Sequence, residues 1–575
     1  MAASRPFLFV ASTMFTRFTR FEATSWCHPA ALCAVVILHV AALVIMVASE
    51  VDLVAKAAYL LVWGVLNSLW LMLFRRPITT AIISHVFIVA LILLSQFKHD
   101  KLWMTVDFVD LMIIDQDTSA FLLMALPSLR LPIGLATMAV ITLSAVAWRL
   151  DPFRVRLHTS AIGSTLCMGG LVSLSLWFPT DLSEDFLNQN YVSKFARTGV
   201  EAAREFVRHG YLESDASVAE SLKSASAAGC NPSRNLPHII LLHDESSFDI
   251  TAAPGMKVPA GYSRHFQSFD GTARRLIVEG AGGPSWFTEY NVLTGLSARS
   301  YGRFAASVTR ISAGRVGRGL PRSLSRCGYK TFSLYPFYGA FLGSRAFQTT
   351  AGVERYLDMS DLGTRKFEAD SFYFSQATKI IDRERDHGPL FLYVYTVANH
   401  FPWDTQLRSE LTASWKSLGN SPSIDEYIRR QSMTAHDYSV LLEQLRQDFP
   451  DEPFLIVRYG DHQPEFGRRV IDPSLGEEAI ARHLEAGDPR YFTTYYAIDT
   501  VNFVPADMSS ALGELEAAYL PLVIQEVAGV PLDATFMEQR KILKRCNGLF
   551  YRCSGGAEVR RFNRLLIDAG LIRGL

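Results

Sequence analysis

Apolar residues are concentrated in long runs before residue 180, and shorter apolar runs alternate with polar stretches after it. A membrane-spanning helix needs about 17–25 consecutive, mostly apolar residues. Five segments meet this requirement: residues 30–48, 57–74, 78–94, 131–148 and 161–178. We therefore predict an all-α transmembrane bundle of about five helices over residues 1–180.

The loops between these segments predict the side of the membrane that each part occupies. Residues 102–129 are less apolar and carry four aspartates, so we expect an interfacial helix and loop there rather than a span. Arginines precede the first span and lie between the second and third and between the fourth and fifth. Because cytoplasmic loops are enriched in Lys and Arg, we expect a cytoplasmic N-terminus and an external C-terminal part.

After the last span the pattern becomes that of a globular domain. Residues 181–230 are polar with aromatic residues at helical spacing, which predicts an amphipathic linker. From residue 231 to residue 575, short apolar runs alternate with helical stretches. The runs cover residues 238–243, 331–334, 389–397, 453–459 and an aromatic-rich 491–497. Continuous apolar strands between helices predict an α/β domain with a central, mainly parallel sheet.

Polar groups suited to catalysis follow three of the predicted strands directly. Glu245 follows the first, His400 the third, and the pair Asp461 and His462 the fourth. In open sheets of this kind, ligands bind outside the carboxyl ends of the strands. Carboxylates with an imidazole suit a divalent cation, which can polarise a phosphoryl oxygen and activate a nucleophile. The sequence therefore predicts a metal-dependent site for phosphate or sulfate esters at this edge.

A glycine-rich stretch, residues 279–291, places hydroxyl groups at the start of a predicted helix. Glycines let the backbone approach a phosphate closely, and the first turn of a helix favours an anion. Ser285 follows Pro284 there and is the predicted nucleophile, with Thr288 one turn later as the competing hydroxyl. Serine is also a preferred capping residue, so a purely structural role is the alternative.

The cysteines of the predicted outer domain are even in number, which favours disulfides in an oxidising compartment. They are Cys230, Cys327, Cys546 and Cys553. Four cysteines allow three pairings. We prefer Cys546 with Cys553, which closes a short loop, and four free thiols are the alternative.

Four segments resemble the membrane-anchored lipoteichoic acid synthase and phosphoglycerol transferase group, which is sulfatase-like and belongs to the alkaline phosphatase superfamily. They are IILLHDES (239–246), GPSWFTEY (283–290), NHFPW (399–403) and YGDHQP (459–464). Five spans before an outer domain are also similar to that group, so the resemblance covers most of the chain. It implies an alkaline-phosphatase/sulfatase-like fold for residues 231–575.

The resemblance also implies roles for residues of this chain. The ligands of one divalent ion, Mn²⁺ or Zn²⁺ with Mg²⁺ as a third option, would be Glu245, Ser285, Asp461 and His462. Ser285, where the group has threonine, would attack a phospholipid phosphate and form a covalent intermediate. His400 would contact the phosphate or protonate a leaving oxygen. Arg345 and Trp403 would bind the substrate.

The expected function is transfer of a phosphoglycerol head group from a membrane phospholipid, preferably phosphatidylglycerol, to a periplasmic glycan or lipid acceptor. The chain would be a multi-pass protein of the bacterial inner membrane with a periplasmic or extracellular catalytic domain. A formal net charge of zero argues against nucleic acid as a partner.

Three alternatives remain open at this point. The first is phosphoethanolamine transfer onto lipid A or a glycan with the same residues. The second is a sulfatase, because Cys230 begins a C-x-P-S-R sequence of the kind that sulfatases oxidise to a formylglycine nucleophile. That motif precedes the first predicted strand here instead of following it, so we prefer a disulfide role for Cys230. The third is a non-catalytic relative that binds lipid.

Overall fold

The computed structural model describes residues 28–222, 230 and 236–575. The described chain forms two compact units. The first comprises the described residues up to Phe108 together with Ser128–Arg204, and the second comprises Val109–Pro127 and Glu205–Leu575. The segment Val109–Pro127, which lies between predicted spans in the sequence, therefore groups with the C-terminal unit.

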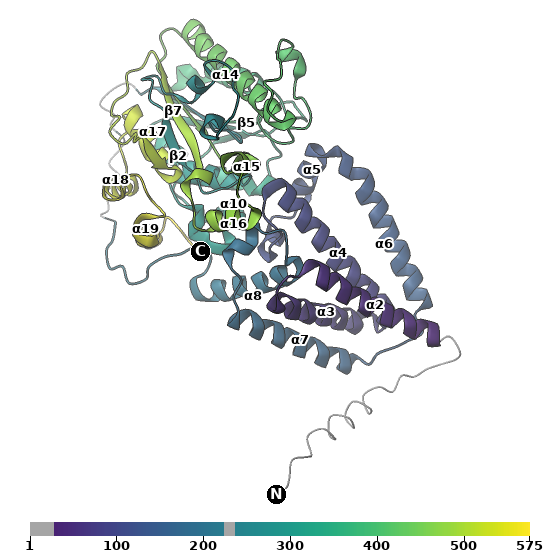
Figure 1. Ribbon diagram of the computed structural model, residues 1–575. Helices are drawn as coiled ribbons and strands as arrows, with labels where there is room; N and C mark the ends of the chain where they lie inside the picture. Colours follow the sequence, from purple (N-terminus) through teal and green to yellow (C-terminus); the bar gives the residue numbers. More distant parts are fainter. Residues whose placement is uncertain (1–27, 223–229, 231–235) are drawn as a thin grey trace. The chain divides into compact units, whose positions relative to one another are not determined.

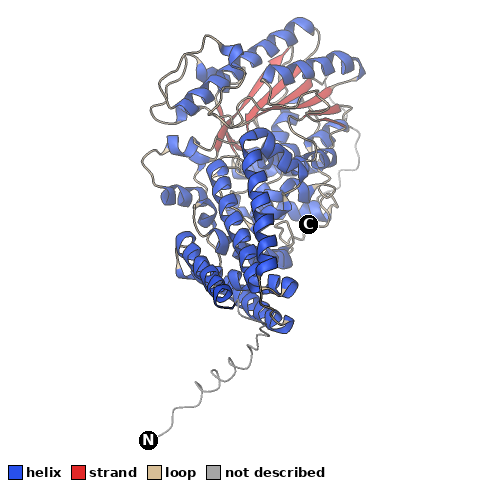
Figure 2. Cartoon of the chain, turned by 90° about the vertical axis from the view of Figure 1, so that its right-hand side faces the viewer, coloured by secondary structure: helices blue, strands red, loops and turns tan. Residues whose placement is uncertain are grey.

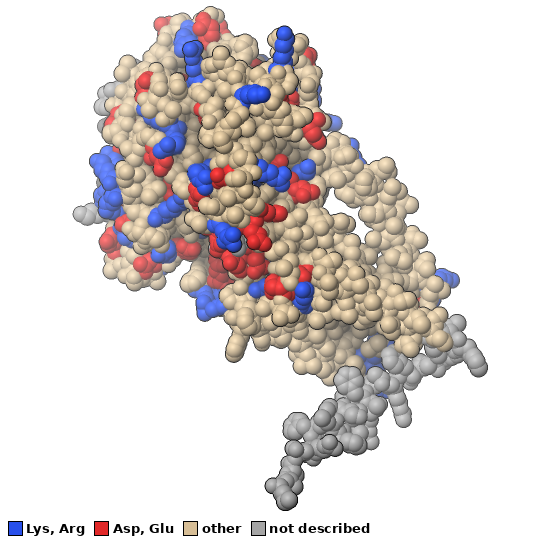
Figure 3. Space-filling view, viewed as in Figure 1, with Lys and Arg blue, Asp and Glu red and all other residues tan. Residues whose placement is uncertain are grey.

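Among the residues that the structure describes, five helices of the first unit are long and apolar enough to cross a membrane, as predicted. They are α2 (His28–Ser49), α3 (Leu53–Phe74), α4 (Pro77–Leu102), α6 (Arg130–Leu150) and α7 (Leu157–Trp177). The space-filling view shows almost no charged side chains on the surface of these helices (Figure 3). Helices α3 and α7 pack closely, because a Cβ on Gly64 would lie 2.5 Å from the Cys167 Sγ. Small residues allow such approaches between membrane helices.

Helix α8 (Tyr191–His209) follows the last apolar helix and contributes a buried cation to the first unit. Lys194 Nζ lies 3.2 Å from Asp107 Oδ1 and 3.0 Å from Asp185 Oδ1. Burial alone would lower the pKa of Lys194, but the two carboxylates outweigh it and raise that pKa to about 12. Because a buried charge is stable only when it is paired, these contacts fix the start of α8.

The second unit is built on one eight-stranded sheet in the order β4-β3-β5-β1-β6-β7-β2-β8. The strands are β1 (His238–Asp244), β2 (Arg274–Ile277), β3 (Lys330–Leu334), β4 (Arg355–Leu357), β5 (Leu390–Thr396), β6 (Phe454–Gly460), β7 (Thr493–Val501) and β8 (Glu514–Glu516). Strand β7 runs antiparallel to both of its neighbours, and every other pairing is parallel. The predicted α/β class with a mainly parallel sheet is therefore confirmed.

The register of the central strands sets the position of the site. Asp244 at the end of β1 pairs with Thr396 of β5 and with Gly460 of β6. All residues of these three strands are buried, which explains their continuous apolar sequences. The residues that follow β1, β5 and β6 therefore emerge side by side at one edge of the sheet.

Most helices of the second unit pack around the sheet, whereas α5 packs against the segment Phe341–Gly343 (Figures 1 and 2). The helices of this unit are α5 (Gln116–Ala125), α9 (Ser285–Thr294), α10 (Val308–Ser312), α11 (Leu320–Ser325), α12 (Ser344–Ala351), α13 (Asp370–Glu384), α14 (Pro422–Asp448), α15 (Gly467–Ile471), α16 (Glu477–Glu485), α17 (Leu520–Ala528), α18 (Ala534–Cys546) and α19 (Ala557–Asp568).

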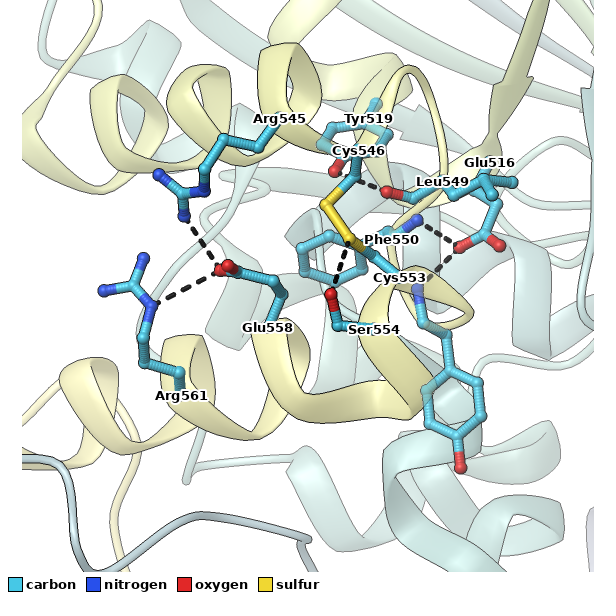
Figure 4. Close-up of a disulfide and its surroundings, with 11 residues drawn as sticks. Glu516, Tyr519, Arg545, Cys546, Leu549, Phe550, Cys553, Ser554, Glu558 and Arg561 are labelled. Atoms are coloured by element: carbon cyan, nitrogen blue, oxygen red, sulfur yellow. Dashed lines mark hydrogen bonds and ion pairs between the residues drawn. A yellow bond between two sulfur atoms is a disulfide. The ribbon is translucent and has the colours of Figure 1, made fainter.

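The described part of the second unit contains two disulfides. Cys546, at the end of α18, pairs with Cys553, which is the preferred pairing from the sequence (Figure 4). Nearby, Glu558 of α19 pairs with Arg545 of α18. The second disulfide joins Cys230 to Cys327 across 97 positions. A cysteine held in a disulfide is not available for conversion to formylglycine, which argues against the sulfatase alternative.

Candidate active site and metal centre

The edge of the sheet brings together the four side chains that the sequence nominates as metal ligands. His462 Nε2 lies 3.3 Å from Glu245 Oε1 and 3.3 Å from Asp461 Oδ2. Ser285 Oγ donates to Glu245 Oε2 at 2.9 Å and lies 3.1 Å from His462 Nε2. Glu245, Asp461 and His462 are almost completely buried. Their oxygen and nitrogen atoms therefore line one small, enclosed polar volume.

The hydrogen bonds of Asp461 fit a metal-ligand role. Its Oδ1 accepts the backbone N–H of Ser246 at 2.7 Å and that of His462 at 2.8 Å. Its Oδ2 is buried and has no hydrogen-bond partner among the described residues. A buried carboxylate oxygen that accepts no hydrogen bond is costly, and a divalent cation would compensate its charge. The donor set of two carboxylates, an imidazole and a hydroxyl suits Zn²⁺ or Mn²⁺.

Charge pairing dominates the titration of this cluster. Burial alone would raise the pKa of Glu245, but the hydrogen bond and charge of the His462 imidazole hold that pKa well below its usual value. Burial alone would lower the pKa of His462, but the charges of Asp461 and Glu245 raise it to about 9. Without a bound divalent cation, the His462 imidazole is therefore protonated at neutral pH and partly neutralises the two carboxylates; a metal would take the place of this proton.

Ser285 is the first residue of helix α9, where the free N–H groups of the first turn favour a phosphate. The loop before it passes close to Arg468, and a Cβ on Gly282 would lie 2.0 Å from Arg468 Nη2. Gly282 also has a positive φ of 76°, so glycine is required there for two reasons. Thr288 donates from Oγ1 to the Asp461 carbonyl at 2.6 Å and is fully buried. Ser285, not Thr288, therefore presents its hydroxyl to the carboxylate and imidazole.

His400 follows β5 at the same edge, inside a group of aromatic rings. Its Nδ1 lies 2.6 Å from the Phe401 carbonyl oxygen and donates to it, which leaves Nε2 for a substrate oxygen. The ring centroid of His400 lies 5.0 Å from that of Phe367, 5.9 Å from Phe337 and 5.7 Å from Phe121. Burial lowers the pKa of His400, so the free imidazole is neutral at pH 7.

Two predicted substrate-binding residues make other contacts. Arg345 Nη2 pairs with Asp358 at 2.7 Å and with Asp361 at 3.2 Å, and its side chain is 46% exposed. Trp403 is buried in an apolar cluster with Tyr427 and Phe466, and its indole N–H donates to the Asn399 carbonyl. The structure therefore does not place either side chain among the metal-ligand candidates, and their substrate role stays a prediction.

Several residues of the site were not nominated from the sequence. Tyr395 donates from its hydroxyl to Glu245 Oε2 at 2.8 Å, and His243 Nε2 lies 3.1 Å from Asp461 Oδ2. The sequence feature that could have identified them is the presence of polar side chains in otherwise apolar strands: Tyr393 and Tyr395 in β5 and His243 in β1. Phe121 comes from α5, which the sequence pattern linked only to a membrane interface.

Helix α5 is fixed to the second unit by polar contacts as well as by Phe121. Asp115, which caps α5, forms an ion pair with Arg310 of α10. Asp117 accepts the backbone N–H of Ala340 at 3.2 Å. Phe121 packs against Phe341 with a centroid distance of 4.5 Å. A segment far from the other site residues in the sequence therefore completes the aromatic surroundings of His400.

A family model and a curated relative match parts of this chain. Residues 285–494 match the family described as Sulfatase. An uncharacterized protein of Haemophilus influenzae is 23% identical over 285 residues, which cover 46% of this chain and 48% of that protein. The chain thus matches about half the length of this curated relative.

Solved structures also resemble the chain. The Streptococcus pyogenes phosphoglycerol transferase GacH, in complex with sn-glycerol-1-phosphate, matches with a TM-score of 0.47 and 14% identity over 60% of this chain and 88% of that chain. The integral membrane lipooligosaccharide phosphoethanolamine transferase A of Neisseria meningitidis matches with a TM-score of 0.43 and 10% identity over 80% of this chain and 89% of that chain. Ser285, His400, Asp461 and His462 all lie within residues 285–494, the segment that matches the Sulfatase family.

Proposed function

We propose that this chain is a membrane-bound phosphotransferase that moves a phosphoglycerol head group from a phospholipid to a glycan or lipid acceptor through a covalent Ser285 intermediate. The observation that carries the proposal is the position of the Ser285 hydroxyl. It lies 2.9 Å from Glu245 and 3.1 Å from His462 at the first turn of a helix. A nucleophile needs an adjacent base or metal and an anion-binding environment, and this position supplies both.

Glu245, Asp461, His462 and Ser285 would hold one divalent cation. When bound, the cation would polarise a phosphoryl oxygen and lower the pKa of the hydroxyl beside it. The carboxylate of Glu245 orients the Ser285 hydroxyl by accepting its hydrogen bond. Tyr395 donates to the same carboxylate oxygen and so fixes the rotamer of Glu245.

In the first step, the bond from Ser285 Oγ to phosphorus forms while the bond from phosphorus to the glycerolipid oxygen breaks. The hydroxyl proton of Ser285 passes to Glu245, which already accepts its hydrogen bond. His400, protonated beside the bound phosphate anion, donates its Nε2 proton to the leaving oxygen, and diacylglycerol departs. In the second step, His400 takes the proton of an acceptor hydroxyl, whose oxygen displaces Ser285 from phosphorus, and Glu245 returns its proton to Ser285 Oγ. The buried aromatic surroundings of His400 exclude water, which favours transfer to the acceptor over hydrolysis.

A lipid donor also accounts for the five apolar helices. They would hold the enzyme in the bacterial inner membrane with the catalytic domain in the periplasm or outside the cell, where donor lipids of the outer leaflet are accessible. The two disulfides support an oxidising compartment for this domain. The segment from Asn399 to Trp403 favours a glycerol phosphate donor over phosphoethanolamine through its resemblance to phosphoglycerol transferases.

Peptide mass spectrometry after incubation with a phospholipid tests this proposal. The metal-loaded, detergent-purified chain is incubated in parallel with phosphatidylglycerol and with phosphatidylethanolamine. A phosphoglycerol adduct on the Ser285 peptide is expected only with phosphatidylglycerol. A phosphoethanolamine adduct on that peptide would keep the mechanism and replace the donor, and an unmodified Ser285 with both lipids would overturn the covalent mechanism.

A further inference from the structure

A second histidine, His243 of β1, faces the same carboxylate oxygen as His462. Asp461 Oδ2 lies 3.1 Å from His243 Nε2 and 3.3 Å from His462 Nε2. The candidate ligand atoms of His243, Glu245 and Asp461 all lie within 4.8 Å of one another. His243 and Asp461 are both completely buried. The imidazole is therefore part of the polar cluster and not of the solvent-facing surface.

The contact between His243 and Asp461 is not a hydrogen bond. Neither His243 Nε2 nor Asp461 Oδ2 has a hydrogen-bond partner in the part of the chain that the structure describes, although the two atoms lie 3.1 Å apart. A core histidine that merely supported the aspartate would direct its N–H at the oxygen. With metal–ligand distances of about 2.0–2.2 Å, neighbouring ligand atoms of a tetrahedral ion lie roughly 3–3.5 Å apart. The separation fits two ligands that share an ion.

The other ring nitrogen of His243 has the partners that a metal-bound imidazole requires. Nδ1 lies 2.8 Å from the hydroxyl of Tyr393 and 2.7 Å from that of Tyr459. Histidines that bind metals almost always donate their second ring N–H to an oxygen, which fixes the tautomer and the ring orientation. Donation from Nδ1 to either tyrosine leaves the Nε2 lone pair facing Asp461.

Stacking fixes the plane of the same ring. The His243 and Tyr395 rings lie 3.7 Å apart between centroids with an interplanar angle of 16°. The Tyr395 hydroxyl donates to Glu245 Oε2, so one tyrosine contacts both His243 and a candidate metal ligand. Restraint of this kind is what holds a first ligand shell in place.

We propose that His243 is a metal ligand of this site, which then offers two imidazoles beside its two carboxylates. The inference deepens the proposed function and rests on its metal requirement. A second neutral nitrogen donor strengthens the preference for Mn²⁺ or Zn²⁺ over Mg²⁺, because Mg²⁺ prefers oxygen ligands.

Pulsed electron paramagnetic resonance on the full-length, Mn²⁺-loaded chain tests the proposal, since ¹⁴N modulation counts coordinated imidazoles. We expect two imidazoles in the wild type and one in His243→Phe, which keeps the ring stacked on Tyr395 but has no nitrogen. Metal titration should show an affinity at least about 10-fold weaker for this variant. The matched control is His238→Phe, a buried histidine at the opposite end of β1, which should keep both imidazoles.

One coordinated imidazole in the wild type, retained in His243→Phe, would overturn the proposal. The number of coordinated imidazoles in the wild type tests the proposal even if the variant does not fold. If the wild type shows one imidazole and still forms the Ser285 adduct, only the role of His243 fails. If the chain binds no Mn²⁺ or Zn²⁺, the metal requirement of the proposed function fails together with it.

Discussion

The Ser285 hydroxyl donates a 2.9 Å hydrogen bond to Glu245, a residue 40 positions earlier in the chain. The two meet because β1 ends at Asp244 and α9 begins at Ser285, both at the carboxyl edge of the sheet. The hydrogen bond fixes the direction of the hydroxyl oxygen. A nucleophile held in one orientation needs little reorganisation before it attacks phosphorus.

Replacing the proposed nucleophile, Ser285, should separate chemistry from metal binding. We expect Ser285→Ala to abolish the covalent adduct and to lower kcat by roughly 10³-fold or more, because no other described hydroxyl contacts both Glu245 and His462. Ser285→Thr should keep the adduct, since it retains a hydroxyl. Steady-state transfer assays and the peptide map measure both. Full activity in Ser285→Ala together with an inactive Thr288→Ala would identify Thr288, not Ser285, as the reacting hydroxyl.

Removal of the metal should lower the stability of the catalytic domain without unfolding it. A ligand present at about 100 times its Kd adds roughly 2.7 kcal/mol to the free energy of unfolding. We expect EDTA to lower the Tm of the wild type and to leave the Tm of Asp461→Ala unchanged. The domain should stay folded in EDTA, because the protonated His462 partly neutralises Glu245 and Asp461. Equal responses of both proteins to EDTA would exclude Asp461 as a ligand.

The sheet and the edge that carries the candidate site were predictable from the sequence for a physical reason. Strands buried on both faces have continuous apolar sequences, and parallel strands end at the same edge. That argument placed Glu245, His400 and Asp461 together before any contact was known. The roles of Tyr393 and Tyr395 were not predictable, because the sequence of a buried apolar strand does not show which side chain the hydroxyl of a tyrosine contacts.

Contacts that depend on tertiary packing were not predictable in this way. Nothing local to residues 102–129 shows that Phe121 lies beside His400, because that contact depends on how a segment between two apolar helices folds back. The ion pairs of Arg345 with Asp358 and Asp361 are a second contact of this kind. The substrate role of Arg345 stays a prediction.

Phe121 should influence the reaction through the surroundings of His400. Burial holds the pKa of His400 below its ordinary value, and Phe121 is one of the rings that bury it. In Phe121→Ala, water should reach the imidazole and raise its pKa, so the limb of the pH–rate profile that reports His400 should move to higher pH. Gln116→Ala, at an exposed position of the same helix, is the matched control. An unshifted profile in Phe121→Ala would show that this ring does not control the solvation of His400.

Asp370 gives a prediction about stability rather than catalysis. This carboxyl group is completely buried at the start of α13, where it accepts hydrogen bonds from the hydroxyl of Thr434 and the backbone N–H of Ala398. Burial, with smaller contributions from the charges of Asp244 and Asp437, raises its pKa to about 8. In the unfolded chain an aspartate has a pKa of about 3.9.

Between about pH 4 and pH 8, the folded protein therefore holds a proton on Asp370 that the unfolded chain has already released. Stability from this group is fully present below about pH 4 and decreases as the pH rises toward 8, because the unfolded state binds fewer protons in that range. Each unit of pKa difference corresponds to about 1.4 kcal/mol.

Asp370→Asn resembles the protonated form, so its Tm in detergent should decrease less than that of the wild type between pH 5 and pH 8. Asp382→Asn, at an exposed position of the same helix, should follow the wild type. Parallel Tm curves for Asp370→Asn and the wild type would mean that Asp370 is ionised in the folded protein throughout this range.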